Sequence, residues 1–240
     1  MLYRIKKYFS RPYAISGFHD ENLAKAYLEK TSNDALHAEF ERKEMLRIIE
    51  NVTSGHIVIA GSGPGLYAED LIDKKNIITC IDNSKAMHEL AYHKLGDQVS
   101  YLTHDLNEMI PLPKDSFDLV ISPLTIQYIS DLQQLYAEFN RILKPGGRAV
   151  VSTIHPFINK GEKYLQKEKI YQEFSEFKIK IQAYRRPLHH LTDAILQNGF
   201  TLRGIYEPLP HESLKQKNKN VYESLSTQPL FIFFEFEKRD

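Results

Sequence analysis

The sequence predicts an α/β fold in which helices cover both faces of a largely parallel β-sheet. Apolar runs of strand length alternate with segments of helical pattern through the middle of the chain, as they do in strand–helix–strand units. A length of 240 residues and a hydrophobic content of 42% allow one sizeable core. We therefore expect one domain over residues 1–240, with appendages around the sheet.

Two helices are predicted ahead of the sheet. Residues 22–30 have a helical pattern, and residues 36–50 place Phe40, Met45 and Ile48 at roughly helical spacing. We expect these helices to form an N-terminal cap, residues 1–52, that lies on or over the sheet.

Five apolar runs are predicted to form parallel strands. They cover residues 56–60, 77–81, 99–102, 117–122 and 148–153. Helical patterns follow three of the first four runs, and a loop follows the third; the helices cover residues 66–73, 84–94 and 131–143. Such crossovers indicate a parallel sheet that is covered on both faces.

The chain after the fifth run departs from this alternation. Residues 156–186 are a polar insert rich in Lys, Glu, Tyr and Phe, and a helix is predicted over residues 187–198. A strand is predicted over residues 200–206, and residues 211–228 have no apolar period and are expected to be a long loop. The last strand, residues 230–237, should pair antiparallel with the strand before it, because no helix is predicted between them.

Composition argues against several functional classes. Basic and acidic residues each number 31, so no global positive field favours nucleic acid or an anionic membrane. The single cysteine, Cys80, lies in an apolar run, where we expect a small core residue rather than a reactive thiol. The ten histidines have no zinc-ligand spacing, so no metal is expected. Without a signal peptide or an apolar run of membrane-spanning length, a cytoplasmic location and no membrane contact are expected.

A glycine-rich loop joins the first parallel strand to the helix after it. The loop reads Gly-Ser-Gly-Pro-Gly over residues 61–65. Glycines allow a sharp turn and let a ligand approach the main chain without meeting a Cβ atom. A dinucleotide-binding loop has its third glycine one position later, where this chain has Leu66. The loop therefore favours a ligand without a pyrophosphate.

Acidic residues follow the next two strands. Asp82 comes about 17 residues after Gly65, where a carboxylate can accept hydrogen bonds from both ribose hydroxyls of a nucleoside. Asp105 could accept from an adenine amino group while the backbone N–H of Leu106 faces a ring nitrogen. A solvated loop aspartate is the alternative for Asp105.

Five short motifs occur in an order typical of one enzyme family. They are Gly-Ser-Gly-Pro-Gly, Ile-Asp-Asn-Ser, Asp-Leu, Phe-Asp-Leu-Val-Ile-Ser and Leu-Lys-Pro-Gly-Gly, at residues 61–65, 81–84, 105–106, 117–122 and 143–147. This series resembles the class I S-adenosylmethionine (SAM)-dependent methyltransferases over about residues 57–153. The resemblance implies a Rossmann-like three-layer sandwich with a seven-stranded, mostly parallel sheet whose last strand is antiparallel.

The resemblance also implies a cofactor, SAM, which becomes S-adenosylhomocysteine (SAH). By this resemblance, Asp82 of this chain would hold the ribose, and Asp105 with Leu106 would contact the adenine. The expected cofactor-binding residues, all in the core at residues 53–155, are Gly61, Ser62, Gly63, Gly65, Asp82, Asn83, Asp105, Leu106 and Ser122. One position departs from the family: an acidic residue that often helps to hold the methionine end is replaced by Ile59.

Later segments are similar to a subgroup of small-molecule methyltransferases. The similarity includes Tyr-Arg-Arg-Pro-Leu at residues 184–188 and extends into the C-terminal part of the sheet, residues 187–240. It implies a small-molecule acceptor with an oxygen, nitrogen or carbon nucleophile. The acceptor pocket is expected to include Gln127, Tyr128, Tyr184, Arg185 and His189. Arg185 or Arg186 suits a carboxylate or phosphate on the acceptor, and solvated residues at the start of a helix are the alternative for this segment.

Methyl transfer from a sulfonium is an in-line displacement, so the protein must align the reactants and exclude water. A general base is needed only if the acceptor loses a proton. His155, just after the fifth strand, is the first candidate for that base, and a loop histidine that only packs or hydrogen-bonds is the alternative.

Other functions are kept as alternatives. The basic stretch at residues 4–11 includes Tyr8 and Phe9, which would suit RNA. A SAM-binding interaction protein without catalysis is consistent with Ile59, whereas Leu66 argues against an NAD-dependent oxidoreductase. The sequence does not determine the oligomeric state, for which a homodimer is one alternative.

Overall fold

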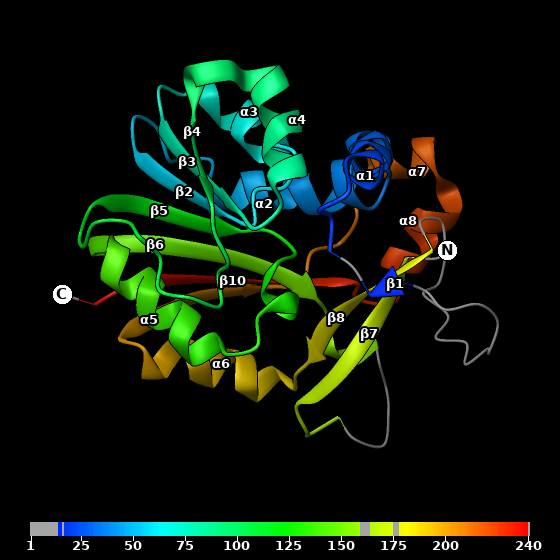
Figure 1. The fold of residues 1–240 in the computed structure, drawn as a ribbon. Coiled ribbons are helices and arrows are strands. Elements are labelled where there is room, and N and C mark those ends of the chain that lie inside the picture. The colour runs from blue at the N-terminus through cyan, green and yellow to red at the C-terminus, as the bar shows by residue number, and fades with distance from the viewer. Residues whose placement is uncertain (1–13, 16, 159–163, 175–177, 240) are drawn as a thin grey trace.

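A seven-stranded sheet forms the centre of the computed structural model, which describes residues 14–15, 17–158, 164–174 and 178–239 (Figure 1). In spatial order its strands are β4 (Ser100–Thr103), β3 (Ile77–Asp82), β2 (His56–Ala60), β5 (Phe117–Ser122), β6 (Leu143–Ile154), β10 (Phe231–Lys238) and β9 (Phe200–Tyr206). Only β10 runs against the others: it pairs antiparallel with both β6 and β9. The predicted sheet and its antiparallel last strand are confirmed.

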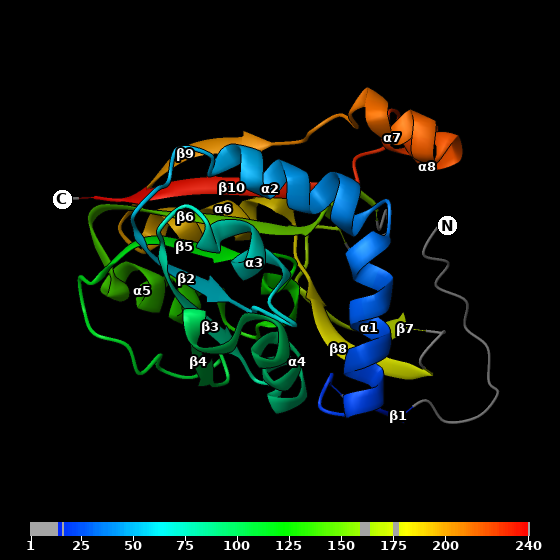
Figure 2. The same cartoon turned by 90° about the horizontal axis from the view of Figure 1, so that it is seen from above.

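Helices cover both faces of this sheet (Figures 1 and 2). On one face lie α5 (Leu132–Ile142) and α6 (Leu188–Gln197), whose apolar side chains pack with Val58 and Ala60 of β2. On the other face α3 (Leu66–Ile72) and α4 (Lys85–Leu95) pack with Ile57 and Ile59. Alternate side chains of a strand point to opposite faces, so a run that is apolar at every position requires this three-layer arrangement.

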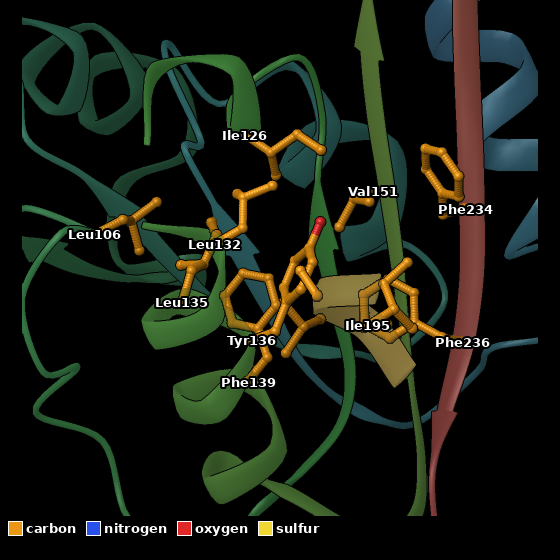
Figure 3. Close-up of a cluster of buried hydrophobic side chains, with 14 of the residues drawn as sticks. Leu106, Ile126, Leu132, Leu135, Tyr136, Phe139, Val151, Ile195, Phe234 and Phe236 are labelled. Carbon is orange, nitrogen blue, oxygen red and sulfur yellow. The ribbon is translucent and has the colours of Figure 1, made fainter. Parts of the chain in front are cut away.

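Aliphatic and aromatic side chains pack together in the layer between the sheet and α5 (Figure 3). Tyr136 and Phe236 are fully buried, with ring centroids 5.3 Å apart, and Phe200 lies edge-on to Phe236 at 4.8 Å. Aromatic pairs at such separations add about 0.5–1.5 kcal/mol to the free energy gained from burial. This layer anchors the antiparallel pair β9–β10 to the rest of the sheet.

The N-terminal cap consists of two helices joined by a wider turn. Helix α1 (Glu21–Asn33) begins at Asp20, whose side chain accepts from the backbone N–H of Leu23. A π-helical turn at His37–Glu41 then leads into α2 (Arg42–Ile48). The predicted helix over residues 36–50 is therefore interrupted by a turn with an extra residue, which apolar spacing does not predict.

The polar insert forms a β-hairpin. Strands β7 (Glu168–Phe174) and β8 (Ile179–Arg185) pair antiparallel, and β1 (Ala14–Ile15) adds a third strand parallel to β8. This small sheet lies beside the carboxyl end of β6 and is separate from the central sheet (Figures 1 and 2). Sequence analysis predicted no strands here, because the alternation of charged and aromatic residues is weak.

The prediction of a long loop at residues 211–228 is wrong, because this segment contains two short helices, α7 (Glu212–Lys217) and α8 (Lys219–Leu225). His211 and Asn218 provide side-chain caps, and one leucine in each helix, Leu214 and Leu225, is buried against the core. A helix that buries a single residue leaves no apolar period, which explains the error. In the described part of the chain, no helix has the length and apolar character needed to cross a membrane.

Candidate functional site

The glycine loop follows β2 directly and has a conformation that only glycine adopts readily. Gly61, Gly63 and Gly65 have φ angles of 77°, 52° and 81°. A Cβ atom at Gly61 would lie 2.0 Å from Oγ1 of Thr125, whereas one at Gly63 would meet nothing within 4 Å. Gly61 therefore allows close packing inside the protein, and Gly63 leaves main chain open toward a neighbouring space.

Asp82 ends β3 and organises this loop. One carboxylate oxygen accepts from the backbone N–H of Gly63 at 2.8 Å, and the other accepts from that of Ser84 at 2.9 Å. Burial raises the pKa of Asp82, although both amide hydrogen bonds act in the opposite direction. Each oxygen has two lone pairs, so each can accept one further hydrogen bond from a ligand.

A hollow opens where β2, β3 and β4 end. We call it the strand-end hollow; six of the expected cofactor residues line it, namely Gly61, Gly63, Asp82, Asn83, Asp105 and Leu106. Ligands of open α/β sheets bind at this carboxyl edge. The space measures about 850 Å³ including its opening to solvent, which is enough for a nucleoside derivative.

Three other expected cofactor residues do not line this hollow. Gly65 lies against α4, where an added Cβ would be 2.9 Å from Cδ1 of Leu95. Ser122 is fully buried and donates to the carbonyl oxygen of Ala60 at 3.0 Å, which ties β5 to β2. Ser62 faces His88, with 3.4 Å between Oγ and Nε2. Their direct roles at a cofactor stay predictions.

The strand-end hollow contains polar atoms that fit an adenosyl ligand. Nε2 of His104, a residue that lines the hollow, is buried and has no hydrogen-bond partner among the described residues. Asp105 uses Oδ1 to accept from Asn107 at 2.8 and 2.9 Å. Together with the open main chain at Gly63, these groups match the polar edges and flat ring of an adenosine. Sequence analysis missed His104, whose only signal is its position next to Asp105.

A family model for a methyltransferase domain matches residues 58–151, the part of the chain that builds this hollow. The motif series that resembles the class I SAM-dependent methyltransferases lies within the same region of the chain. The malonyl-[acyl-carrier protein] O-methyltransferase of Buchnera aphidicola is 33% identical over 110 residues, covering 46% of this chain and 44% of that protein. Across the first curated relatives, the matched part of the chain spans between 22% and 57% of their length.

Solved structures of methyltransferases have the same fold. A SAM-dependent methyltransferase from Mesorhizobium loti superposes with a TM-score of 0.73 and is 23% identical, covering 81% of this chain and 96% of that one. A geranyl diphosphate methyltransferase in complex with SAM gives a TM-score of 0.62 at 19% identity, covering 91% of this chain and 90% of that one.

A second hollow lies between the methyltransferase core and the β7–β8 hairpin. We call it the hairpin hollow; the expected residues Gln127, His155, Tyr184 and Arg185 line it. Tyr128 lines the strand-end hollow instead, and its hydroxyl donates to Oε1 of Gln172 at 2.9 Å. His189 is exposed on α6 and lines neither of these hollows. Because Gln127 and Tyr128 are adjacent in one 3₁₀ turn, Ile126–Tyr128, the two hollows share a wall.

His155 has a partner at each ring nitrogen. Nδ1 accepts from the backbone N–H of Phe157 at 3.0 Å, and Nε2 lies 2.8 Å from Oε1 of Glu207. Burial lowers the pKa of His155 against the opposing effect of Glu207. A role as general base stays a prediction: in this arrangement the proton of the neutral ring lies on Nε2, so the basic nitrogen is Nδ1, and the hydrogen bond from Phe157 would have to open.

The two arginines that follow Tyr184 have different surroundings. Arg186 is buried and donates to the carbonyl oxygens of Ile126, Ile129 and Ser130, and burial lowers its pKa to about 10. It therefore holds the loop after β5. Arg185 has one ion pair, 3.5 Å from Glu168, and its buried Nε has no hydrogen-bond partner among the described residues. Arg185 is the arginine with donor capacity left for a ligand.

A third hollow, which sequence analysis missed, lies between the glycine loop and the N-terminal cap. We call it the cap hollow; its walls include Tyr27, Thr31, His37, Glu41 and Arg42 from the cap and residues 61–64 from the loop. The cap was predicted only as a cover for the sheet. The one signal in the sequence was the absence of an acidic residue at Ile59.

Proposed function

We propose that this protein transfers the methyl group of SAM to a small-molecule acceptor bound in the hairpin hollow. The observation that carries the proposal is the pair of adjoining hollows that share the turn of Gln127 and Tyr128. One hollow has the groups for an adenosyl ligand, and the other has a mixed lining of apolar and polar side chains that includes an arginine with donor capacity left. Methyl transfer requires the methyl group of SAM in one hollow to face the nucleophilic atom of the acceptor in the other.

The residues of this chain would bind and orient rather than react covalently. When bound, SAM supplies a methyl group activated by its sulfonium sulfur. Asp82 would accept from the ribose hydroxyls, while Asp105 and the N–H of Leu106 would contact the adenine. The hairpin and the cap cover the site on two sides, which would exclude water from the reacting atoms.

We further propose that the acceptor carries a carboxylate or phosphate held by Arg185. The unpartnered Nε supports this, since a guanidinium binds such groups with two parallel hydrogen bonds. The curated relatives named malonyl-[acyl-carrier protein] O-methyltransferases also favour an acyl carboxyl acceptor. A carboxylate nucleophile is already ionised at neutral pH and would need no base, whereas a hydroxyl or thiol would give His155 a role.

Thermal unfolding with SAM, SAH or NADH tests the cofactor part of this proposal. A ligand at 100 times its Kd stabilises the native state by about 2.7 kcal/mol. We expect both adenosyl ligands to raise the Tm and Asp82→Ala to abolish the shift, while the exposed control Asp97→Ala keeps it. A shift with NADH and none with SAM would refute the proposed function.

Transfer from radiolabelled SAM to a panel of carboxylic acids, acyl thioesters, phenols and amines tests the acceptor. We expect Arg185→Met to lower the activity on anionic acceptors mainly through KM. SAH binding without transfer to any acceptor would favour a non-catalytic SAM-binding protein. RNA stays an alternative acceptor, but the basic stretch at residues 4–11 on which it depends lies outside the described residues.

A further inference from the structure

The methionine end of SAM carries both a positive ammonium and a negative carboxylate, and both must be placed near the glycine loop. Ile59 supplies no charge: it is fully buried among the apolar side chains that face α3. An ammonium taken from water into a protein needs an anionic partner. If SAM binds as proposed above, on which this inference rests, that partner must come from another element.

The cap hollow contains a charged group of each sign beside the loop. Gly61, Ser62 and Gly63 line it from the glycine loop, and Glu41 and Arg42 line it from the cap. Of the described residues that line this hollow, Glu41 has the only carboxyl group and Arg42 the only guanidinium. Asp82 and Asp105 line the strand-end hollow on the other side of the loop, where the ribose and adenine are expected.

Glu41 is held in place by residues of the methyltransferase core. Its side chain accepts from the hydroxyl of Tyr67 at 2.5 Å and from Oγ of Ser152 at 2.6 Å. Ser152 in turn accepts from the backbone N–H of Leu124, which also lines the cap hollow. Each oxygen of Glu41 receives one hydrogen bond and can accept another, so the carboxylate is oriented without being saturated.

The surroundings of Glu41 favour a cationic ligand. The residue is only 2% exposed, and burial raises its pKa, although the hydrogen bonds from Ser152 and Tyr67 act in the opposite direction. His37 and Arg42 also lower the pKa of Glu41, but burial outweighs them, so a bound ammonium would lower the remaining cost of burying the carboxylate. The only arginine beside it, Arg42, has Nε 3.5 Å from Oδ2 of Asp70, and its other donors can face a ligand.

The π-helical turn at His37–Glu41 explains how neighbouring residues reach one hollow. Such turns are rare and occur frequently at functional sites. The turn ends at Glu41, and α2 begins at Arg42, so the change in helical geometry falls at these two residues.

We propose that Glu41 binds the ammonium and Arg42 the carboxylate of the methionine end of SAM, so that the N-terminal cap completes the cofactor site. The cap would then provide the negative charge that is missing at Ile59. The alternative is that Glu41 only ties the cap to the sheet.

Calorimetric titration with SAH and with methylthioadenosine tests this assignment, since the second ligand keeps the adenosine and sulfur but lacks the amino-acid end. Glu41→Gln is expected to weaken SAH binding by roughly 10- to 150-fold, the effect of losing a hydrogen bond to a charged group. Arg42→Gln, at a partly exposed position, should weaken it by roughly 3- to 10-fold. Neither variant should change the affinity for methylthioadenosine.

Two residues on the same helix are matched controls. Glu44→Gln and Arg47→Gln alter an ion pair, 2.6 Å between Arg47 and Glu44, that is not part of the cap hollow, and both variants should bind SAH as the wild type does. Equal losses for both ligands, or no loss for either, would overturn the proposal and leave Glu41 a structural residue. If Glu41→Gln does not fold, Arg42→Gln decides on the same criteria. A wild-type protein that binds neither ligand would instead refute the proposed function.

Discussion

Two buried tyrosines should respond in opposite directions when the hydroxyl group is removed. Tyr136 is fully buried between α5 and the sheet, and its hydroxyl has no hydrogen-bond partner among the described residues (Figure 3). Tyr67 is 7% exposed, and its hydroxyl donates to the carboxyl group of Glu41. Replacement by Phe removes one oxygen in each case, so the two changes differ mainly in what that oxygen contacts.

The expected free-energy changes follow from hydrogen bonding. A buried polar group without a partner costs about 1–3 kcal/mol, so after some loss of packing Tyr136→Phe should stabilise the protein by about 1–2 kcal/mol. For a chain of this size that corresponds to a rise in Tm of about 2–8 °C. Tyr67→Phe removes a hydrogen bond to a carboxylate and should destabilise by about 1.5–3 kcal/mol.

Urea unfolding of the wild type and both variants, followed by circular dichroism, measures these changes, and equal m-values would show that the comparison is valid. The two variants should differ by about 2.5–5 kcal/mol, with the wild type between them. If Tyr136→Phe is less stable than the wild type by more than about 1 kcal/mol, its hydroxyl has a partner and the reasoning is refuted.

Three further predictions concern the core and the loop. Phe236→Ala, at a fully buried position, should lower the free energy of unfolding by about 3–5 kcal/mol in urea titrations, and a loss below about 1 kcal/mol would contradict the packing described. Gly61→Ala should destabilise strongly, because its Cβ would overlap Thr125. Gly63→Ala should cost only about 1–2 kcal/mol of backbone strain, but it should weaken SAH binding. Equal effects of the two variants on stability would count against the different packing assigned to these glycines. Burial raises the pKa of Cys80 to about 12, so at pH 8 only about one thiol in 10⁴ is ionised. The native protein should therefore react with a disulfide reagent only as it unfolds. Rapid labelling without urea would show that the thiol is accessible.

Features that depend on short stretches of chain were predicted well. The parallel strands follow from apolar runs, and the glycine loop follows from positions where positive φ is required. Asp82 could be placed because the end of β3 lies next to the end of β2 in any parallel sheet of this kind.

Features that depend on contacts between distant residues could not be predicted. Ser152 and Glu41 are 111 positions apart, and nothing near either residue indicates that they share a hydrogen bond. The same is true of the ion pair between His155 and Glu207 and of the different surroundings of Arg185 and Arg186. Helices α7 and α8 were missed because each buries only one leucine, and which residue is buried depends on the surface against which the helix packs.

The sequence by itself therefore determined the α/β class, the glycine loop and the acidic residues at the strand ends, because backbone conformation and side-chain periodicity are local properties. The tertiary structure alone decided which polar groups are satisfied, which remain available, and that a π-helical turn brings Glu41 and Arg42 to the glycine loop. Hydrogen-bond satisfaction and burial are properties of the packed chain, since they depend on every element that surrounds a side chain.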